Sequence, residues 1–168
     1  ELQWDLGYMG TYSPDRQPGL DRLLLKPARE LRDCHLVVAG PNFPQVESWP
    51  GNVKHFTHLA PDRHRVFYNE QRFTLNLTRA AMAAVGFSPS VRLFEAGACG
   101  VPIISDRWEG LNTFFMPGEE ILVAASPAEV TEIVQDMPET QRAAIGARAR
   151  AAVLARHTAG HRALELES

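Results

Sequence analysis

Short apolar runs alternate with amphipathic stretches along almost the whole chain. Runs that are rich in β-branched residues and closed by glycine, proline or polar residues are typical of strands. They predict strands over Leu6–Tyr12, His35–Ala39, Val53–Thr57, Phe73–Leu77, Val101–Ser105 and Glu120–Ala124. Between these runs, leucine and alanine recur at helical spacing. This spacing predicts helices over Gly19–Arg32, Arg63–Asn69, Ser90–Cys99, Pro127–Asp136 and Glu139–Leu166.

Continuous apolar strands separated by helices are typical of a parallel sheet that helices cover on both faces. We therefore expect an α/β protein, with residues 1–168 forming one Rossmann-like, three-layer α/β/α domain around a mostly parallel sheet. The proline-rich stretch Pro41–Pro50 is predicted to be a long surface loop, because proline disrupts strand pairing. The last predicted helix is either an outer helix of this sandwich or a connection to a further domain.

Several polar residues and glycines follow the predicted strands directly. They are Gly10, Gly40, His58, Arg79 and the loop Trp108–Gly110. Ligands of open parallel sheets bind at the carboxyl ends of the strands, so we expect these residues to share one ligand-binding edge. In the last loop, Trp108 and Glu109 either contact a ligand or form part of a domain interface.

The segment from Ser88 to Gly110 is the most informative part of the chain. Ser88 suits the N-cap of a helix and Pro89 its first position. The backbone N–H groups of Ser90 and Val91 would then be free at the positive end of the helix dipole, where phosphate binds well.

Glu95 lies one turn beyond Val91 on the same predicted helix face. From there its carboxylate could accept hydrogen bonds from a sugar hydroxyl while phosphate sits at the helix N-terminus. Without a partner, a carboxylate among apolar residues would be costly to desolvate. The alternative is a structural ion pair between Glu95 and Arg92 or another arginine.

Arg16, Arg79 and Arg92 are predicted to lie near the same edge. Guanidinium groups match phosphate oxygens in a bidentate way, and could neutralise a diphosphate where no metal is bound. The alternative for each is solvated surface charge. His55, His58 and His64 match no zinc spacing, so we expect no metal site, and His58 is instead a candidate to pack near a nucleobase.

Composition narrows the function classes. With 45% hydrophobic and 22% charged residues the chain is an ordinary globular sequence, and its net charge of −3 gives no reason to expect nucleic acid or an anionic membrane as a partner. The apolar runs are too short to span a bilayer, and no secretory signal opens the chain. Two cysteines make no disulfide framework, which favours reduced thiols and a cytoplasmic location. The first residue is Glu1, not Met, so we expect a piece of something longer.

The block SPSVRLFEAGACGVPIISD resembles the nucleotide-sugar-binding motif of the group 1 glycosyltransferases, and is most similar to their spore-maturation-protein-like branch. The resemblance extends over nearly the whole chain. It implies the C-terminal, donor-binding half of the GT-B architecture, without the N-terminal domain that binds the acceptor. It also implies transfer of a sugar from a nucleoside-diphosphate donor to an unknown acceptor hydroxyl, with retention of configuration and without metal or cofactor.

The resemblance also implies roles for individual residues. Glu95 matches the family carboxylate that holds the ribose hydroxyls, and Ser90 and Val91 match the backbone N–H groups that meet the diphosphate. Gly10 matches the glycine that ends the first strand, Arg16 falls where the family carries a basic residue for the diphosphate, and Gly110 lies in a glycine-containing turn near the donor. The catalytic residues are not identified.

Two positions depart from the family pattern. Glu95 matches the second glutamate of the family's E-x7-E motif, and Phe87, eight residues earlier, stands where the wider family has the first, which contacts the donor sugar. The first-strand loop reads Gly10-Thr11 and lacks the arginine that often follows the glycine. Two other functions therefore stay open: a nucleotide-sugar epimerase of the same fold, and an interaction domain that kept the fold without catalysis. A nicotinamide oxidoreductase is disfavoured because the loop after Gly10 lacks the G-x-G-x-x-G spacing.

Overall fold

The computed structural model describes residues 1–161 and residue 163. Its centre is a six-stranded sheet in the order β3-β2-β1-β4-β5-β6, and every pairing between neighbouring strands is parallel. The strands are β1 (Trp4–Met9), β2 (Leu36–Ala39), β3 (Val53–Phe56), β4 (Gln71–Asn76), β5 (Ile103–Ser105) and β6 (Leu122–Val123). The expected fold class is confirmed. After β3 the chain crosses to the other side of β1 and adds β4, so the strand order reverses between β1 and β4.

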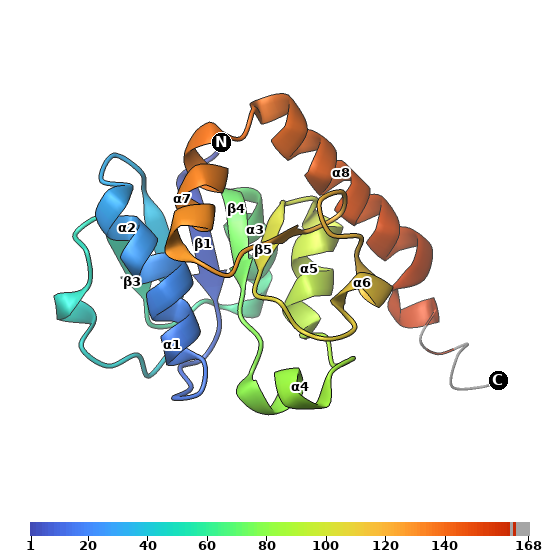
Figure 1. Cartoon of the computed structure of the whole chain (residues 1–168), viewed down its shortest axis with the longest axis horizontal. Helices are drawn as coiled ribbons and strands as arrows, with labels where there is room; N and C mark the ends of the chain where they lie inside the picture. Colours follow the sequence, from blue (N-terminus) through green and yellow to red (C-terminus); the bar gives the residue numbers. More distant parts are fainter. Residues whose placement is uncertain (162, 164–168) are drawn as a thin grey trace.

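Helices cover both faces of the sheet and give three layers (Figure 1). One face is covered by the continuous helical segment α1 (Gln17–Leu20), η1 (Asp21–Leu25) and α2 (Lys26–Glu30), together with α7 (Pro127–Asp136). The other is covered by α3 (His64–Asn69), α5 (Val91–Cys99) and α8 (Glu139–Arg156).

The pleat of each strand divides the core between the two faces. On β2, Val38 belongs to the leucine-rich core under α1, α2 and α7, whereas Val37 packs with Phe67 of α3. On β5, Ile104 belongs to the same leucine-rich core, whereas Ile103 packs on the opposite face, in the core that includes Leu93 of α5. Strands β2 and β5 are therefore buried on both sides, which explains why they read as continuous apolar runs. The edge strand β3 alternates instead, with Lys54 and Phe56 exposed.

Some predicted boundaries were wrong. The helix predicted over Gly19–Arg32 contains a π-helical turn, η1, just before Pro27, which has no N–H to continue the α-helical pattern. The last predicted helix corresponds to α8, which ends at Arg156. Its predicted end, Leu166, lies outside the described residues. After Arg156, His157 turns away from helical geometry, and its Nε2 lies 3.0 Å from the Phe114 carbonyl oxygen.

Short helical segments were missed. They are α4 (Ala80–Val85), α6 (Leu111–Phe114) and the 3₁₀ turns η2 (Val46–Ser48) and η3 (Pro61–Arg63). α6 and the two 3₁₀ turns are too short to show the repeating apolar spacing that identifies a helix. α4 has the sequence AAMAAV and no buried residue, so it shows no separate apolar face. Cys34 and Cys99 are free and half-buried, and burial raises the pKa of both thiols. In the described part of the chain, no helix is long and apolar enough to cross a bilayer.

Candidate functional site

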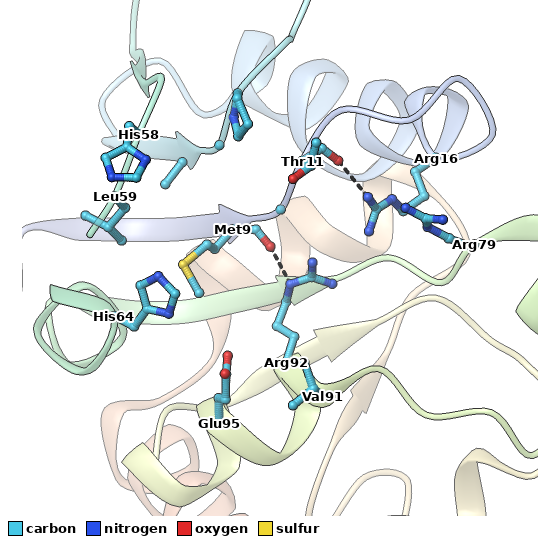
Figure 2. Close-up of a pocket in the computed structure, with 14 residues that line it drawn as sticks. Met9, Thr11, Arg16, His58, Leu59, His64, Arg79, Val91, Arg92 and Glu95 are labelled. Carbon is cyan, nitrogen blue, oxygen red and sulfur yellow. Dashed lines mark hydrogen bonds between the residues drawn. The ribbon is translucent and has the colours of Figure 1, made fainter. Parts of the chain in front are cut away.

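A cavity of about 410 Å³ opens at the carboxyl edge of the sheet, beside the point where the strand order reverses. Figure 2 shows it with arginines at one end and histidines at the other. Residues from the ends of β1 and β2, the loops after β3 and β4, and helices α3 and α5 line it: Met9, Gly10, Thr11, Arg16, Ala39, Gly40, Pro41, His58, Leu59, His64, Arg79, Val91, Arg92 and Glu95. This is the place where open α/β sheets bind ligands.

Most of the candidate residues from the sequence meet in this cavity. Of the ten, Ser90 and Gly110 are not among its lining residues. His64, considered from the sequence only as a metal ligand, lines the cavity from α3, and Thr11, Pro41 and Leu59 join it from the loops. No local sequence signal singled out these last three, because the sheet topology alone brings them to the edge.

Gly10 and Gly40 bring two strand ends close together at the cavity floor. A Cβ on Gly40 would overlap the carbonyl oxygen of Gly10 and lie 2.7 Å from its carbonyl carbon, and Gly40 has a φ of +146°. A Cβ on Gly10 would lie 2.6 Å from Nη2 of Arg92 and 2.7 Å from the Tyr8 hydroxyl. A side chain at Gly40 would therefore require the backbone to move, whereas one at Gly10 would displace the Arg92 guanidinium or the Tyr8 hydroxyl.

Helix α5 points its N-terminus at the cavity, but it begins two residues later than predicted. Ser90, rather than Ser88, is the N-cap, and its Oγ accepts a hydrogen bond from the Arg92 N–H at 3.4 Å. Ser90 can cap because its backbone is extended, which leaves Ser88 and Pro89 outside the helix. Within the described residues the Ser90 and Val91 N–H groups donate to no other group, so both are available to an anion.

Arg92 is buried and anchors the end of β1 to α5. Its Nε donates to the carbonyl oxygen of Met9, and its Nη1 lies 3.4 Å from Oδ1 of Asn76. The guanidinium carbon lies 5.0 Å from the centre of the Tyr8 ring. Nη2 has no hydrogen-bond partner among the described residues and lies beside Gly10, on the cavity.

Arg16 adds a second guanidinium at the same end of the cavity. Its Nη2 donates to the Thr11 carbonyl oxygen at 2.6 Å, and its Nε is buried without a partner in the described part of the chain. Burial lowers the pKa of Arg16, and repulsion from Arg92 and Arg79 acts in the same direction. The site therefore gathers positive charge, which an oxyanion would neutralise.

Arg79 lies on the outer rim, as the exposed N-cap residue of α4. The following residue, Ala80, donates its N–H to Oδ2 of Asp15 at 3.1 Å, which joins α4 to the loop after β1. This bond holds Arg79 and Arg16 on neighbouring loops, and Figure 2 shows their side chains close together.

Glu95 lines the cavity from α5, and no ion pair joins it to an arginine in the described part of the chain. Its Oε2 accepts a hydrogen bond from the Tyr68 hydroxyl at 3.4 Å, and its Oε1 has no partner among the described residues. The structural ion pair considered from the sequence is therefore not formed. The carboxylate remains able to accept hydrogen bonds from a ligand.

Histidines occupy the other end of the cavity. His58 lies on the loop after β3 and is exposed, whereas His64 is half-buried on α3 (Figure 2). His55 does not line this cavity, since its Nε2 lies 2.9 Å from the Gly40 carbonyl oxygen. Among the residues that the structure describes, no three His, Cys, Asp or Glu side chains are grouped to hold a metal ion.

The loop after β5 is arranged differently from the prediction. Trp108 is 6% exposed and packs against Phe114 in the core, so it is not an exposed aromatic that contacts a ligand or another domain. Gly110 has a φ of +89°, and a Cβ there would lie 2.8 Å from Cγ of Phe87. Gly110 therefore makes room for the Phe87 ring, which is exposed to solvent.

The comparisons with known proteins agree with this geometry. A protein-family model described as glycosyl transferase-like matches residues 16–168. No curated protein matches the chain. Solved structures with a similar fold include sucrose-phosphate synthase from Thermosynechococcus elongatus, with a TM-score of 0.74 and 16% identity, over 98% of this chain and 44% of that one.

Two similar structures contain a sugar nucleotide. Anabaena Alr3699/HepE in complex with UDP-glucose has a TM-score of 0.67 and 16% identity over 89% of this chain and 43% of that one. A T4 phage BGT mutant in complex with UDP-glucose has a TM-score of 0.75 and 10% identity over 92% and 44%. At these identities the likeness shows the fold, and the chain spans less than half the length of each of these proteins. With the family model matching almost its whole length, the chain belongs to the glycosyl transferase-like family.

Proposed function

We propose that this chain is the donor-binding domain of a GT-B glycosyltransferase, which transfers a sugar from a nucleoside-diphosphate donor to an acceptor hydroxyl. The observation that carries the proposal is the polarity of the cavity. The unpaired N–H donors at the N-terminus of α5 and the arginines lie at one end of the cavity. Farther along α5 lies the carboxylate of Glu95, which forms no ion pair with an arginine among the described residues. A diphosphate joined to a ribose has this same order of charges and hydroxyl groups.

In this proposal the diphosphate binds at the N-terminus of α5. The Ser90 and Val91 N–H groups, the free Nη2 of Arg92 and the guanidinium of Arg16 donate to its oxygens. When the sugar leaves the nucleotide, negative charge grows on the diphosphate, and these donors stabilise it electrostatically. Because the arginines supply this charge, we propose that transfer needs no divalent metal.

The nucleoside lies toward the other end of the cavity. One α5 turn beyond Val91, Oε1 of Glu95 accepts hydrogen bonds from the ribose hydroxyls, and His58, Leu59 and His64 border the space for the base. Two proteins with this fold were solved in complex with UDP-glucose, which supports a sugar nucleotide as the kind of ligand. The identity of the base, sugar and acceptor stays unassigned.

The resemblance to group 1 glycosyltransferases implies a retaining, hexosyltransferase-type enzyme of the spore-maturation-like branch, working in the cytoplasm. Membership of a glycosyl transferase-like family supports sugar transfer over epimerisation or a non-catalytic role.

Replacing Glu95 by alanine tests the ribose contact. We expect Glu95→Ala to weaken binding of a nucleoside diphosphate by about 1–3 kcal/mol, because the ribose hydroxyls lose their acceptor. Calorimetric titration of UDP, GDP and ADP into both proteins measures this. Glu132→Ala, an exposed glutamate on α7, is the matched control and should bind as the wild type does. Equal affinity of Glu95→Ala and the wild type would contradict the ribose role.

We also expect the 168-residue chain to bind the donor without transferring its sugar. The acceptor would be held by the second domain of the GT-B fold, and the chain spans 43–44% of similar proteins. Incubation with UDP-, GDP- and ADP-linked sugars and simple alcohol acceptors, followed by mass spectrometry, tests this. Efficient sugar transfer by the chain would show that one domain suffices.

A further inference from the structure

Behind the cavity wall, a buried tyrosine contacts the carboxylate that faces the ligand. Tyr68, on α3, is 1% exposed, and its hydroxyl donates to Oε2 of Glu95 on α5 at 3.4 Å. Among the described residues this is the only hydrogen bond of the Tyr68 hydroxyl. A buried hydroxyl needs a partner, so the pair joins the core to the cavity wall.

In this pair, Tyr68 acts only as the hydrogen-bond donor and Glu95 only as the acceptor. Burial raises the pKa of the Tyr68 phenol far above its ordinary value, and the Glu95 carboxylate also opposes its ionisation. Tyr68 therefore stays protonated and acts as a donor at any physiological pH. The carboxylate accepts at Oε2, which leaves Oε1 for a ligand.

The surroundings of the two side chains differ in rigidity. The Tyr68 ring packs in the core with Leu93, Ala96 and Ile103 and against Phe67, which restricts its rotamers. Glu95 is half-buried and has three rotatable bonds, so in isolation it would sample many positions. A bond from a fixed donor selects among these positions and lowers the entropy that ligand binding would otherwise have to remove.

We propose that Tyr68 is a positioning residue for the nucleotide ribose. Its hydroxyl holds Oε2 of Glu95 so that Oε1 faces the cavity, where the 2′ and 3′ hydroxyls of a ribonucleotide donate to it. This inference rests on the proposed function. The preference of the site for a ribose with both hydroxyls would then depend on Tyr68, a core residue that does not line the cavity.

The test compares matched ligands on matched variants. UDP, GDP and ADP are titrated into the wild-type chain, and the nucleotide that binds is compared with its 2′,3′-dideoxy counterpart. We expect Tyr68→Phe to weaken binding of the ribonucleotide about three- to tenfold and to leave binding of the dideoxynucleotide unchanged. In a Glu95→Ala background, which has no side-chain acceptor for the Tyr68 hydroxyl, the same Tyr68→Phe change should have no further effect. Tyr12→Phe removes a tyrosine hydroxyl outside the cavity lining and should not alter either affinity.

Each contrary result has its own meaning. If the wild type binds a ribonucleotide and Tyr68→Phe binds it equally well, the positioning role is wrong and the proposed function stands. Equal weakening of both nucleotides would show that Tyr68 only supports the packing of the cavity, which also overturns the inference. If the wild type binds none of the three nucleotides, the proposed function fails, and the role of Tyr68 fails with it.

Discussion

Gly40→Ala should destabilise the fold by about 3 kcal/mol or more and abolish nucleotide binding. The added methyl group would overlap the backbone of Gly10, and a backbone carbonyl cannot rotate away as a flexible side chain can. The φ of +146° adds strain for any residue with a Cβ. The loops after β1 and β2 would have to separate, and these loops form the cavity floor. Urea unfolding followed by circular dichroism measures the loss.

Gly51→Ala is the matched control for this change. A Cβ on Gly51 would meet no heavy atom within 4 Å. We expect its free energy of unfolding to stay within about 0.5 kcal/mol of the wild type, as for most surface substitutions. Wild-type stability of Gly40→Ala would show that the two strand ends are not in close contact.

Arg92→Met should weaken nucleoside diphosphate binding by about 1.5–3 kcal/mol, the range for hydrogen bonds to charged groups. The variant loses the free Nη2 donor and the bond that holds the Met9 carbonyl at the cavity edge. We expect the free energy of unfolding to fall by less than the free energy of nucleotide binding does. Although the bonds to Met9 and Asn76 are lost, repulsion between Arg92 and Arg16 in the empty site is relieved.

Calorimetric titration and urea unfolding on the same preparations separate the two effects. Arg22→Met serves as control, because Arg22 is exposed and lies outside the cavity lining. It should match the wild type in both measurements. An Arg92→Met variant that binds nucleotide at wild-type affinity would remove Arg92 from the diphosphate site.

The sheet and the location of the site could be predicted from the sequence because both depend on local signals. Continuous apolar runs identify buried parallel strands, and the ligand edge of such a sheet follows from its topology. Glu95 could be placed relative to Val91 because both lie in one helix, where spacing determines the face.

Features that depend on contacts between distant segments could not be predicted in this way. Nothing near Tyr68 in the sequence indicates that it meets Glu95, since the contact requires α3 to pack against α5. Trp108 follows a strand in the same way as the cavity residues do, yet its ring turns into the core. The sequence also left the partner of Arg92 open, and the structure shows the Met9 carbonyl rather than Glu95.

Titration of the unmodified chain with UDP, GDP and ADP in the presence of EDTA tests the central claim most directly. We predict saturable, one-to-one binding of at least one nucleotide, competed by pyrophosphate, because the arginines and the α5 N–H groups replace a metal at the diphosphate. No binding of any of the three at millimolar concentration, or binding only when a divalent cation is restored, would contradict the site described for this chain.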